Sequence, residues 1–311
     1  MATATYERRA SLLPLDHGLL KDRHVSSSFK MSRASGLSYS MSTKPTKLPD
    51  KAAIIRTAGT VLKTSSVEIE RYDGCLYRTY LLRGREDSFC VMRCPPQPTL
   101  RLLRIEEDRL AIEAQALHLL SRRRAVTAPS VLDDDTASSN SFLISGPFTG
   151  SILGDLDRSL SVQRQEILDR SLGRYIRRVS SLTGPAFGPL DRPCMQSWAR
   201  CFASMLETVL RDAEDSLASL PYDSIRMQVR RHSRSLERVT EPRLVLVEAA
   251  DEDNIVFDES TGQVTSLFDY GTAMWADPFF SDCFCQPSEA FLDGYGESLG
   301  TDADKRIRQL L

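Results

Sequence analysis

The alternation of apolar and polar residues predicts a meander of three short strands early in the folded part of the chain. Runs rich in β-branched, aromatic and aliphatic residues cover positions 67–72, 75–82 and 88–93. Turn-forming residues separate these runs, with Asp73-Gly74 at the first break. Apolar runs with turn signals between them are typical of antiparallel strands joined by short connections.

A helix is predicted next, followed by two further strands. Between positions 103 and 123 apolar residues return at helical spacing, and these are Ile105, Leu110, Ala114, Leu117 and Leu120. Strand-like runs at 128–132 and 141–145 flank the polar stretch 133–140. The order of three strands, one helix and two strands predicts a small lobe built on an antiparallel sheet.

The second half of the chain has a different pattern, which predicts two long amphipathic helices. The first helix would bury a face formed by Ile167, Leu172, Tyr175, Ile176 and Val179. The second helix would bury a face formed by Trp198, Phe202, Met205 and Val209. We therefore expect a helical lobe to follow the β-rich lobe.

A β-hairpin is predicted after these helices. The apolar runs 255–257 and 264–268 flank the turn-rich stretch 258–262, which is the pattern of an antiparallel pair. Closing this hairpin would bring Asn254, just before the first strand, beside Asp269, just after the second. An amide oxygen next to a carboxylate suits Mg²⁺, which takes hard oxygen ligands and keeps water and phosphate as the others. Asn254 and Asp269 are therefore the predicted metal ligands.

This hairpin region resembles the aminoglycoside phosphotransferase family, the small-molecule branch of the protein-kinase-like fold. The family's catalytic loop reads H-G-D-x-x-x-x-N, and an I-D-[FWY]-[GE] element follows a hairpin of this length and ends near D-P. Weaker similarity extends over residues 67–296. The resemblance implies an α+β, two-lobed protein-kinase-like fold, with a small β-rich N-lobe and a larger helical C-lobe. It also implies ATP and Mg²⁺ as cofactors.

The chain departs from the family at the catalytic triplet. Counting back from Asn254, the triplet is Val247-Glu248-Ala249, so Val247 replaces the family's His and Ala249 replaces its catalytic Asp. The residue that would accept the proton of the substrate hydroxyl is therefore absent. Glu248 or Asp251 could serve as a displaced base. The alternative is that these residues form an acidic loop on an inactive site.

The resemblance also implies a nucleotide-binding pair in the small lobe. The strand at 88–93 ends in Arg93, where the family has Lys or Arg, and the following helix offers Glu113. In kinase-like proteins such a cation contacts the nucleotide phosphates, and a helix carboxylate holds it in place. Two alternatives stay open: Arg93 could be a surface arginine, and Glu106 or Glu107 could take the place of Glu113.

The composition of the chain indicates which partners it lacks and in which cellular compartment it occurs. The formal net charge of −2 and the pI near 6.2 provide no general basic field for nucleic acid. No apolar run approaches the roughly 18 residues needed to span a bilayer. The seven cysteines are odd in number and form no CxxC pair, which fits a reducing compartment. We therefore expect a cytoplasmic protein that binds neither nucleic acid nor membrane.

Three regions are predicted along the chain. Residues 1–50 are Ser-rich and basic and have no periodic apolar face, so we expect a disordered tail. The N-lobe, with the sheet and one helix, is predicted at 51–146. The helical C-lobe with the metal-binding hairpin is predicted at 147–311.

Three functions remain compatible with these features. The first is transfer of phosphate from ATP to the hydroxyl or amine of a small molecule; the resemblance to fungal relatives in secondary metabolism implies a biosynthetic role. The second is a pseudokinase that acts as a binding or scaffold protein for a protein partner. The third is a kinase-like pocket reused for chemistry other than phosphoryl transfer. Fold-level analogy does not identify the acceptor.

Overall fold

The computed structural model describes residues 51–84, 88–97, 99–134, 142–157, 159–296 and 303–310. All of these residues belong to one structural unit, Thr46–Leu311. The predicted disordered tail at 1–50 lies outside the described residues, as does most of the polar stretch 133–140.

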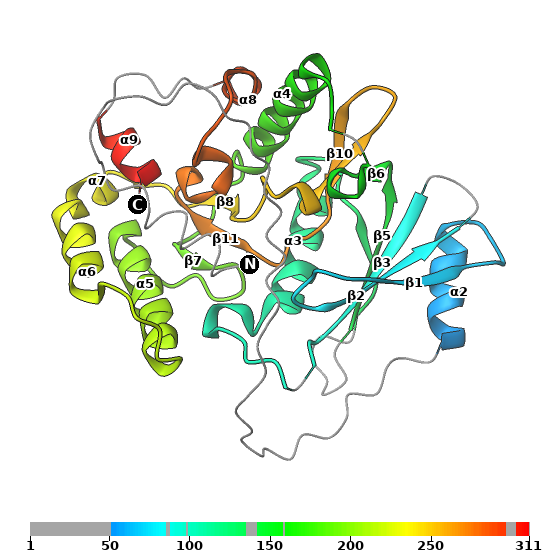
Figure 1. Cartoon of the computed structure of the whole chain (residues 1–311), viewed down its shortest axis with the longest axis horizontal. Coiled ribbons are helices and arrows are strands. Elements are labelled where there is room, and N and C mark those ends of the chain that lie inside the picture. Colours follow the sequence, from blue (N-terminus) through cyan, green and yellow to red (C-terminus); the bar gives the residue numbers. More distant parts are fainter. Residues whose placement is uncertain are drawn as a thin grey trace. The chain divides into compact units, whose positions relative to one another are not determined.

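A five-stranded antiparallel sheet forms the small lobe, in the spatial order β1-β2-β3-β5-β4 (Figure 1). The strands are β1 Glu68–Tyr72, β2 Arg78–Arg83, β3 Ser88–Cys94, β4 Ser130–Asp134 and β5 Leu143–Thr149. The predicted order along the chain, with three strands, one helix and two strands, is confirmed. The predicted start of β2 at position 75 was wrong, because residues 73–77 form the connection from β1.

Strand β5 also runs past its predicted end at position 145. Gly146-Pro147 follows at this point, and proline has no N–H to donate to a sheet. The pairing of β5 with β3 shifts register at this point, from Ser145 opposite Val91 to Phe148 opposite Phe89. A bulge therefore accommodates the two residues, and the strand continues to Thr149.

Side-chain alternation gives the sheet two different faces. On one face, Met92 of β3 packs with residues of α2 (Lys51–Val61), a helix that the sequence analysis did not predict. On the other face, Phe89 and Val91 pack with residues of the C-lobe hairpin. Arg93 has the same parity as Phe89 and Val91, so it too points toward the place where the lobes meet.

Helix α3 (Arg109–Arg123) lies on the side of the sheet that Arg93 faces, since its Glu113 pairs with Arg93. The helix begins later than predicted. A separate 3₁₀ turn, η1 (Arg104–Glu106), precedes it. The backbone N–H of Leu103 donates to Glu106 Oε2 over 2.8 Å, which closes this turn on itself. Ile105, which was predicted to lie in the helix, belongs to this turn and is 45% exposed.

The C-lobe contains the helices α4 Val162–Val179, α5 Trp198–Asp215, α6 Tyr222–Arg231, α7 Ser233–Glu237, α8 Glu289–Tyr295 and α9 Ala303–Leu310. Helices α4 and α5 are the two predicted amphipathic helices. Each begins after a serine, Ser161 or Ser197, whose hydroxyl accepts a backbone N–H of the first turn. Ile167 of α4 is 38% exposed, so only the rest of its predicted face is buried.

Two glycines allow α4 and α8 to pack with their backbones in contact. A Cβ at Gly173 of α4 would collide with the carbonyl oxygen of Phe291. A Cβ at Gly294 of α8 would collide with the carbonyl group of Arg170. Larger residues at these two positions would therefore force the helices apart.

The predicted hairpin is confirmed as β9 (Ile255–Asp258) and β10 (Gln263–Leu267). In the turn, Asp258 Oδ1 accepts the N–H groups of Ser260 and Thr261. The remaining short elements are β6 Ser151–Ile152, η2 Leu153–Asp155, β7 Gly188–Pro189, β8 Arg243–Leu246, η3 Glu252–Asn254, β11 Ala273–Ala276, η4 Pro278–Phe280 and η5 Asp282–Phe284. Strand β6 pairs with β9, and β11 lies between β7 and β8.

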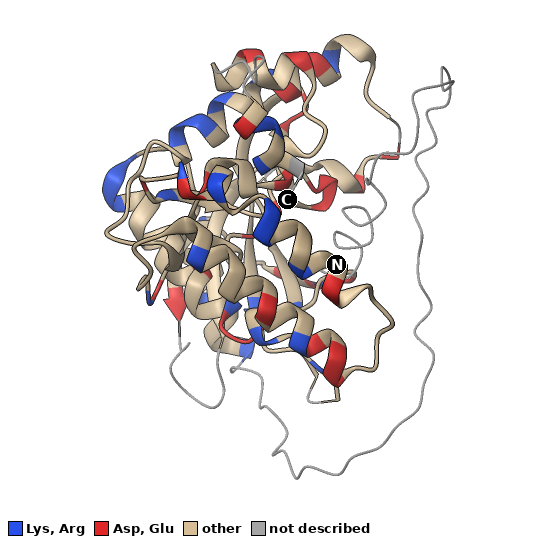
Figure 2. Ribbon diagram, turned by 90° about the vertical axis from the view of Figure 1, so that its left-hand side faces the viewer, with Lys and Arg blue, Asp and Glu red and all other residues tan. Residues whose placement is uncertain are grey.

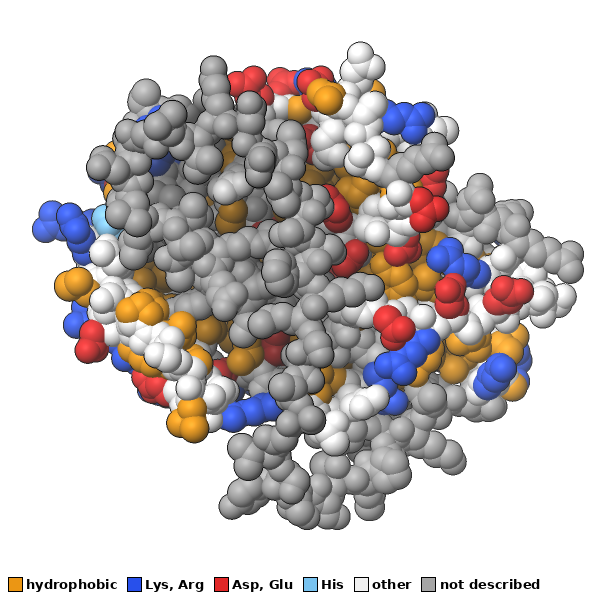
Figure 3. All heavy atoms as spheres, in the orientation of Figure 1, with side chains coloured by type: hydrophobic (Ala, Val, Ile, Leu, Met, Phe, Trp, Pro, Cys, Tyr) orange, Lys and Arg blue, Asp and Glu red, His pale blue; other side chains and the backbone are white. Residues whose placement is uncertain are grey.

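Charged residues of both signs are distributed over the described surface. Figure 2 shows Lys or Arg and Asp or Glu positions on the same C-lobe helices. On the face drawn in Figure 3, basic and acidic side chains are likewise intermixed. Among the described helices, none has the length and apolar character needed to cross a membrane.

Candidate active site

The predicted pairing of Arg93 with Glu113 is present in the N-lobe. Arg93 Nη1 lies 2.5 Å from Glu113 Oε1, and the two side chains are only 4% and 1% exposed. Burial opposes the charge of the guanidinium, but Glu113 and Asp269 raise the pKa of Arg93. Burial raises the pKa of Glu113 to about 8, against the attraction of Arg93. The competing partners Glu106 and Glu107 do not pair with Arg93.

Arg93 also connects the N-lobe to the end of the hairpin. Its Nη2 donates to the carbonyl oxygen of Phe268 over 2.6 Å. Its guanidinium lies 4.7 Å from the centre of the Phe268 ring, which is within the range of a cation–π interaction. The next residue along the chain is Asp269, so the small-lobe cation is fixed close to the predicted metal ligand.

The hairpin brings Asn254 and Asp269 together as predicted. The backbone N–H of Asp269 donates to Asn254 Oδ1 over 2.5 Å. The Phe268 N–H donates to the Asn254 carbonyl oxygen over 2.8 Å. Asn254 Nδ2 in turn donates to the carbonyl oxygen of Glu248 over 2.6 Å. Asn254 therefore links the loop at 247–250 to the end of β10.

The oxygen atoms of this pair have the right chemistry for Mg²⁺. Asn254 Oδ1 accepts one N–H, and Asp269 Oδ1 accepts the N–H of Gly271 over 2.6 Å. A carbonyl or carboxylate oxygen has two lone pairs, so each residue keeps acceptor capacity. The described residues contain no group of three or more His, Cys, Asp or Glu arranged for a metal. The two side chains offer hard oxygen atoms, which suit an ion such as Mg²⁺ that also keeps water and phosphate as ligands.

The loop that replaces the family triplet is held by a residue that the sequence analysis missed, Asp282. The N–H groups of Ala249 and Ala250 both donate to Asp282 Oδ1 over 2.9 Å. The Asp282 N–H donates to the carbonyl oxygen of Val247, also over 2.9 Å. Burial raises the pKa of Asp282 to about 7, although the two loop N–H groups oppose this shift.

Glu248, one of the two candidate bases, pairs with Arg109 of α3. Arg109 Nη1 and Nη2 donate to the two carboxylate oxygens over 3.0 and 3.1 Å. This bidentate arrangement is the stronger form of a charge-assisted hydrogen bond. Accepting a proton at Glu248 would therefore compete with the pair to Arg109.

Asp251, the other candidate base, begins the short turn η3. Its Oδ1 accepts the N–H of Asp253 over 3.1 Å, and the residue is half-buried. The same turn ends at Asn254, so Asp251 lies on the segment that carries one predicted metal ligand. Its role as a base stays a prediction.

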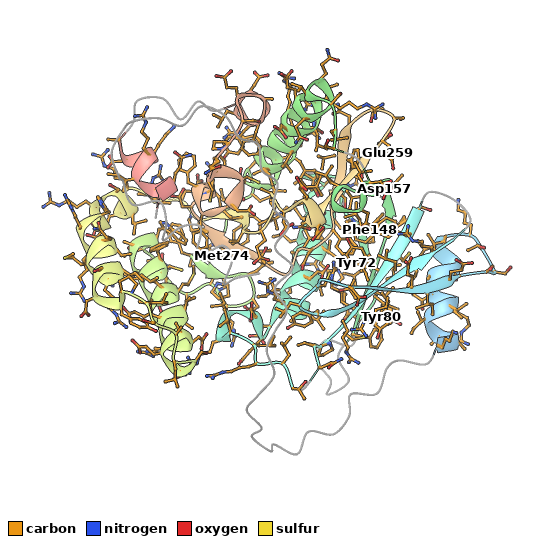
Figure 4. All side chains as sticks on the ribbon, viewed as in Figure 1. Tyr72, Tyr80, Phe148, Asp157, Glu259 and Met274 are labelled. Atoms are coloured by element: carbon orange, nitrogen blue, oxygen red, sulfur yellow. The ribbon has the colours of Figure 1, made fainter. Side chains whose placement is uncertain are left out.

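An aromatic cluster fills the space between the sheet and the hairpin. The Phe268 ring centre lies 5.2 Å from that of Tyr72 and 5.9 Å from that of Phe148. Phe89 stacks on Phe148 at 5.2 Å, and Figure 4 shows Tyr72 and Phe148 close together in this region. The Tyr72 hydroxyl donates to Asp155 Oδ1 over 3.0 Å. Aromatic side chains thus join the two lobes directly.

The fold and the arrangement of these residues define the class of protein. A β-rich lobe with an arginine–glutamate pair meets a helical lobe with an Asn–Asp hairpin, as in protein-kinase-like proteins. Residues 69–281 match the sequence profile of the Phosphotransferase enzyme family. The chain belongs to this family. Among curated proteins, none matches the chain significantly.

Three solved structures show the similarity of the fold. The macrolide 2'-phosphotransferase of Brachybacterium faecium is 18% identical with a TM-score of 0.53, over 83% of this chain and 87% of that one. A putative fructosamine-3-kinase from Haemophilus somnus is 16% identical with a TM-score of 0.56, over 82% and 85%. A thermostable mutant of aminoglycoside phosphotransferase APH(4)-Ia is 17% identical with a TM-score of 0.56, over 82% and 87%. The predicted two-lobed α+β fold is confirmed.

Proposed function

We propose that this chain binds a nucleoside triphosphate, with ATP as the expected one, together with Mg²⁺, and transfers phosphate to the hydroxyl or amine of a small molecule. The observation that supports this proposal is the direct connection between the two predicted pairs. Arg93, held by Glu113, donates to the residue that precedes Asp269. A phosphate-binding cation and a metal-binding carboxylate therefore lie side by side where the lobes meet.

In this proposal, each residue of the network has a separate task. Arg93 contacts the phosphates, and Glu113 holds its guanidinium in place. Asn254 and Asp269 hold Mg²⁺, which neutralises part of the phosphate charge when it is bound. Asp251 accepts the proton of the acceptor group, because the carboxylate oxygens of Glu248 are engaged by Arg109.

The missing carboxylate at Ala249 lowers the rate of transfer in this proposal without abolishing it. A general base contributes about 10²–10⁴-fold to the rate of a typical enzyme. Phosphoryl transfer passes through a loose transition state, so positioning and electrostatic stabilisation supply most of the catalysis. The arginine, the metal ligands and the fixed loop would still provide these contributions.

A pseudokinase that acts as a binding or scaffold protein is the second candidate, and two observations favour it. Ala249 is completely buried, and its loop N–H is taken by Asp282. The aromatic cluster around Phe268 also occupies the space between the lobes. These rings hold the two lobes together without a bound nucleotide.

Thermal unfolding with and without ATP and Mg²⁺ tests nucleotide binding. A ligand at 100 times its dissociation constant stabilises the folded protein by about 2.7 kcal/mol, so the melting temperature should rise. Asp269→Ala should remove most of this rise, because it deletes a metal ligand. Asp293→Ala is the matched control, since Asp293 pairs with Arg170 at an exposed site on α8, and it should leave the rise unchanged.

The outcome separates the two candidates when it is combined with an assay for ADP release. Turnover with small amines or alcohols would support the phosphotransferase. A rise in melting temperature without turnover would favour a nucleotide-binding pseudokinase. An equal rise in the wild type and in Asp269→Ala would contradict the proposed metal site.

The acceptor in the phosphotransferase proposal is a small molecule, and a place in secondary metabolism is the setting we propose for it. A protein partner replaces the acceptor in the pseudokinase proposal. We place the protein in the cytoplasm, and the support for this is the state of its cysteines. All seven carry free thiols, which fits a reducing compartment.

A further inference from the structure

Arg109 lies in the centre of the candidate site, although no motif pointed to it. It is one helical turn before Glu113 on α3, so the two side chains share a face of the helix. Glu113 pairs with Arg93, and Arg109 pairs with Glu248. The helix therefore contributes one charge of each sign to the region between the lobes.

The guanidinium of Arg109 is largely enclosed, and it binds the residue whose carbonyl oxygen accepts a hydrogen bond from Asn254. Its side chain is 11% exposed, against 22% for Glu248. A Cβ built at Gly271 would lie 3.0 Å from Asp269 Oδ1 and 3.1 Å from Arg109 Cβ. The backbone of Gly271 thus lies between the start of the Arg109 side chain and the Asp269 carboxylate, where a larger residue would fit tightly. Burial lowers the pKa of Arg109, but the negative charges of Glu248 and Asp269 raise it by more.

A purely structural role would explain the position of Arg109 less well. The segment before α3 is already tied to α5, because Arg104 pairs with Asp212 at 2.5 Å and with Asp215 at 2.7 Å. Asp108 is tied to Arg192 at 2.6 Å. These bonds fix the start of the helix without Arg109. A guanidinium also has more N–H groups than the two that Glu248 accepts.

We propose that Arg109 is a phosphate-binding residue that the chain itself supplies beside the metal site. Glu248 holds the guanidinium in a fixed orientation, and its other N–H groups meet the phosphate oxygens. The proposal deepens the proposed function, since it concerns the same site. Its consequence is that phosphate chains bind with less dependence on Mg²⁺ than they would if Arg93, Asn254 and Asp269 acted without Arg109.

The test uses the full chain and inorganic tripolyphosphate in EDTA, so neither a base nor a metal contributes. Binding is measured from the shift in melting temperature at increasing ligand concentration. A charge-assisted hydrogen bond contributes enough that Arg109→Gln should weaken binding by about 10- to 100-fold. Arg109→Lys keeps the charge without the planar fork, and it should recover part of this loss.

Two further variants separate phosphate binding from structural support. Glu248→Gln removes a negative charge and leaves Arg109 in place, so tripolyphosphate should bind as tightly as to the wild type or more tightly. If Arg109 only supported the fold, Arg109→Gln and Glu248→Gln would weaken binding alike. Arg104→Gln is the matched control, because Arg104 pairs with α5 outside the site, and it should not change binding.

The proposal is overturned if the wild type does not bind tripolyphosphate in EDTA, or if Arg109→Gln binds it as well as the wild type does. ATP with Mg²⁺ is measured in parallel. Stabilisation by ATP and Mg²⁺ with no effect of tripolyphosphate would leave the proposed function standing and remove the role of Arg109. Binding of tripolyphosphate without stabilisation by ATP and Mg²⁺ would contradict the proposed function and keep the phosphate-binding role of Arg109.

Discussion

The side chain of Ala249 has no exposed surface and belongs to the main hydrophobic cluster of the C-lobe. Its neighbour Ala250 is exposed. The loss of the family's carboxylate is thus accompanied by apolar packing at the same position. Burying a carboxylate costs several kcal/mol unless a partner compensates its charge, so the local packing now opposes a return of the acid.

Ala249→Asp should therefore lower the free energy of unfolding, by roughly 2–4 kcal/mol, because it places a carboxylate in an apolar environment. Urea-induced unfolding at neutral pH measures this change. Ala250→Asp is the matched control, and its effect should stay within about 0.5 kcal/mol because the position is exposed. Equal stability of Ala249→Asp and wild type, with a gain in ATP turnover, would show that the loop still accommodates the family's base.

The site residues that are close along the hairpin could be predicted from the sequence, and those that are distant along the chain could not. Asn254 and Asp269 were found because strand alternation and turn signals place them at the same end of two paired strands. Asp282 and Arg109 were missed because their contacts to the loop join positions 33 and 139 residues apart. No local pattern encodes such pairs. The roles of Arg93, Glu113, Asn254, Asp269, Glu248 and Asp251 stay predictions.

At the scale of the elements, the strands and long helices form where the periodicity of apolar residues predicts them. The errors concern the ends of elements and the helix that directly follows residues 1–50. Helix α2 was missed because only Ile54, Ala58 and Gly59 are buried along its length, which is a weak periodic signal. The start of α3 was placed too early because a 3₁₀ turn and an α-helix have similar apolar spacing over so short a distance.

The close contact between α4 and α8 leads to a prediction about Gly173. Alanine at an ordinary helix position is about 1 kcal/mol more favourable than glycine. Gly173→Ala should instead destabilise the protein by about 1–3 kcal/mol, because the added methyl group collides with the backbone of α8. Thermal or urea unfolding would measure this difference.

Gly84→Ala provides the control for this prediction. A Cβ at Gly84 would come no closer than 3.4 Å to Leu62 and Thr64 side-chain atoms, which is ordinary van der Waals contact. Its effect on stability should be small. If Gly173→Ala were as stable as Gly84→Ala, the contact between α4 and α8 would not depend on glycine.

At the scale of the whole described unit, the lobes are joined by side chains that belong to both. The cluster around Phe268 contains Phe89 and Val91 from the sheet and Val256 from the hairpin. The order of elements along the chain predicted the two lobes. How the lobes pack could not be predicted, because the cluster joins residues that are distant along the chain. The lobe boundary at 146/147 stays a prediction.

Phe268→Ala should lower the free energy of unfolding by about 3–5 kcal/mol, the usual cost of removing a buried aromatic ring. The ring contacts Tyr72 and Phe148 and lies beside the Arg93 guanidinium. Tyr80→Ala is the control, because Tyr80 is a half-buried ring of β2 outside this cluster, and its loss should cost less. Similar costs for both variants would argue against a special role of the cluster in joining the lobes.

The hydrogen bonds of Asp282 have a consequence for anions near the loop at 247–250. A backbone amide has one hydrogen to donate, and those of Ala249 and Ala250 already point to the Asp282 carboxylate. These two amides therefore cannot form an anion-binding nest of the kind that main-chain N–H groups build elsewhere. Any negatively charged group that approaches this loop has to be met by side chains such as Arg93 and Arg109.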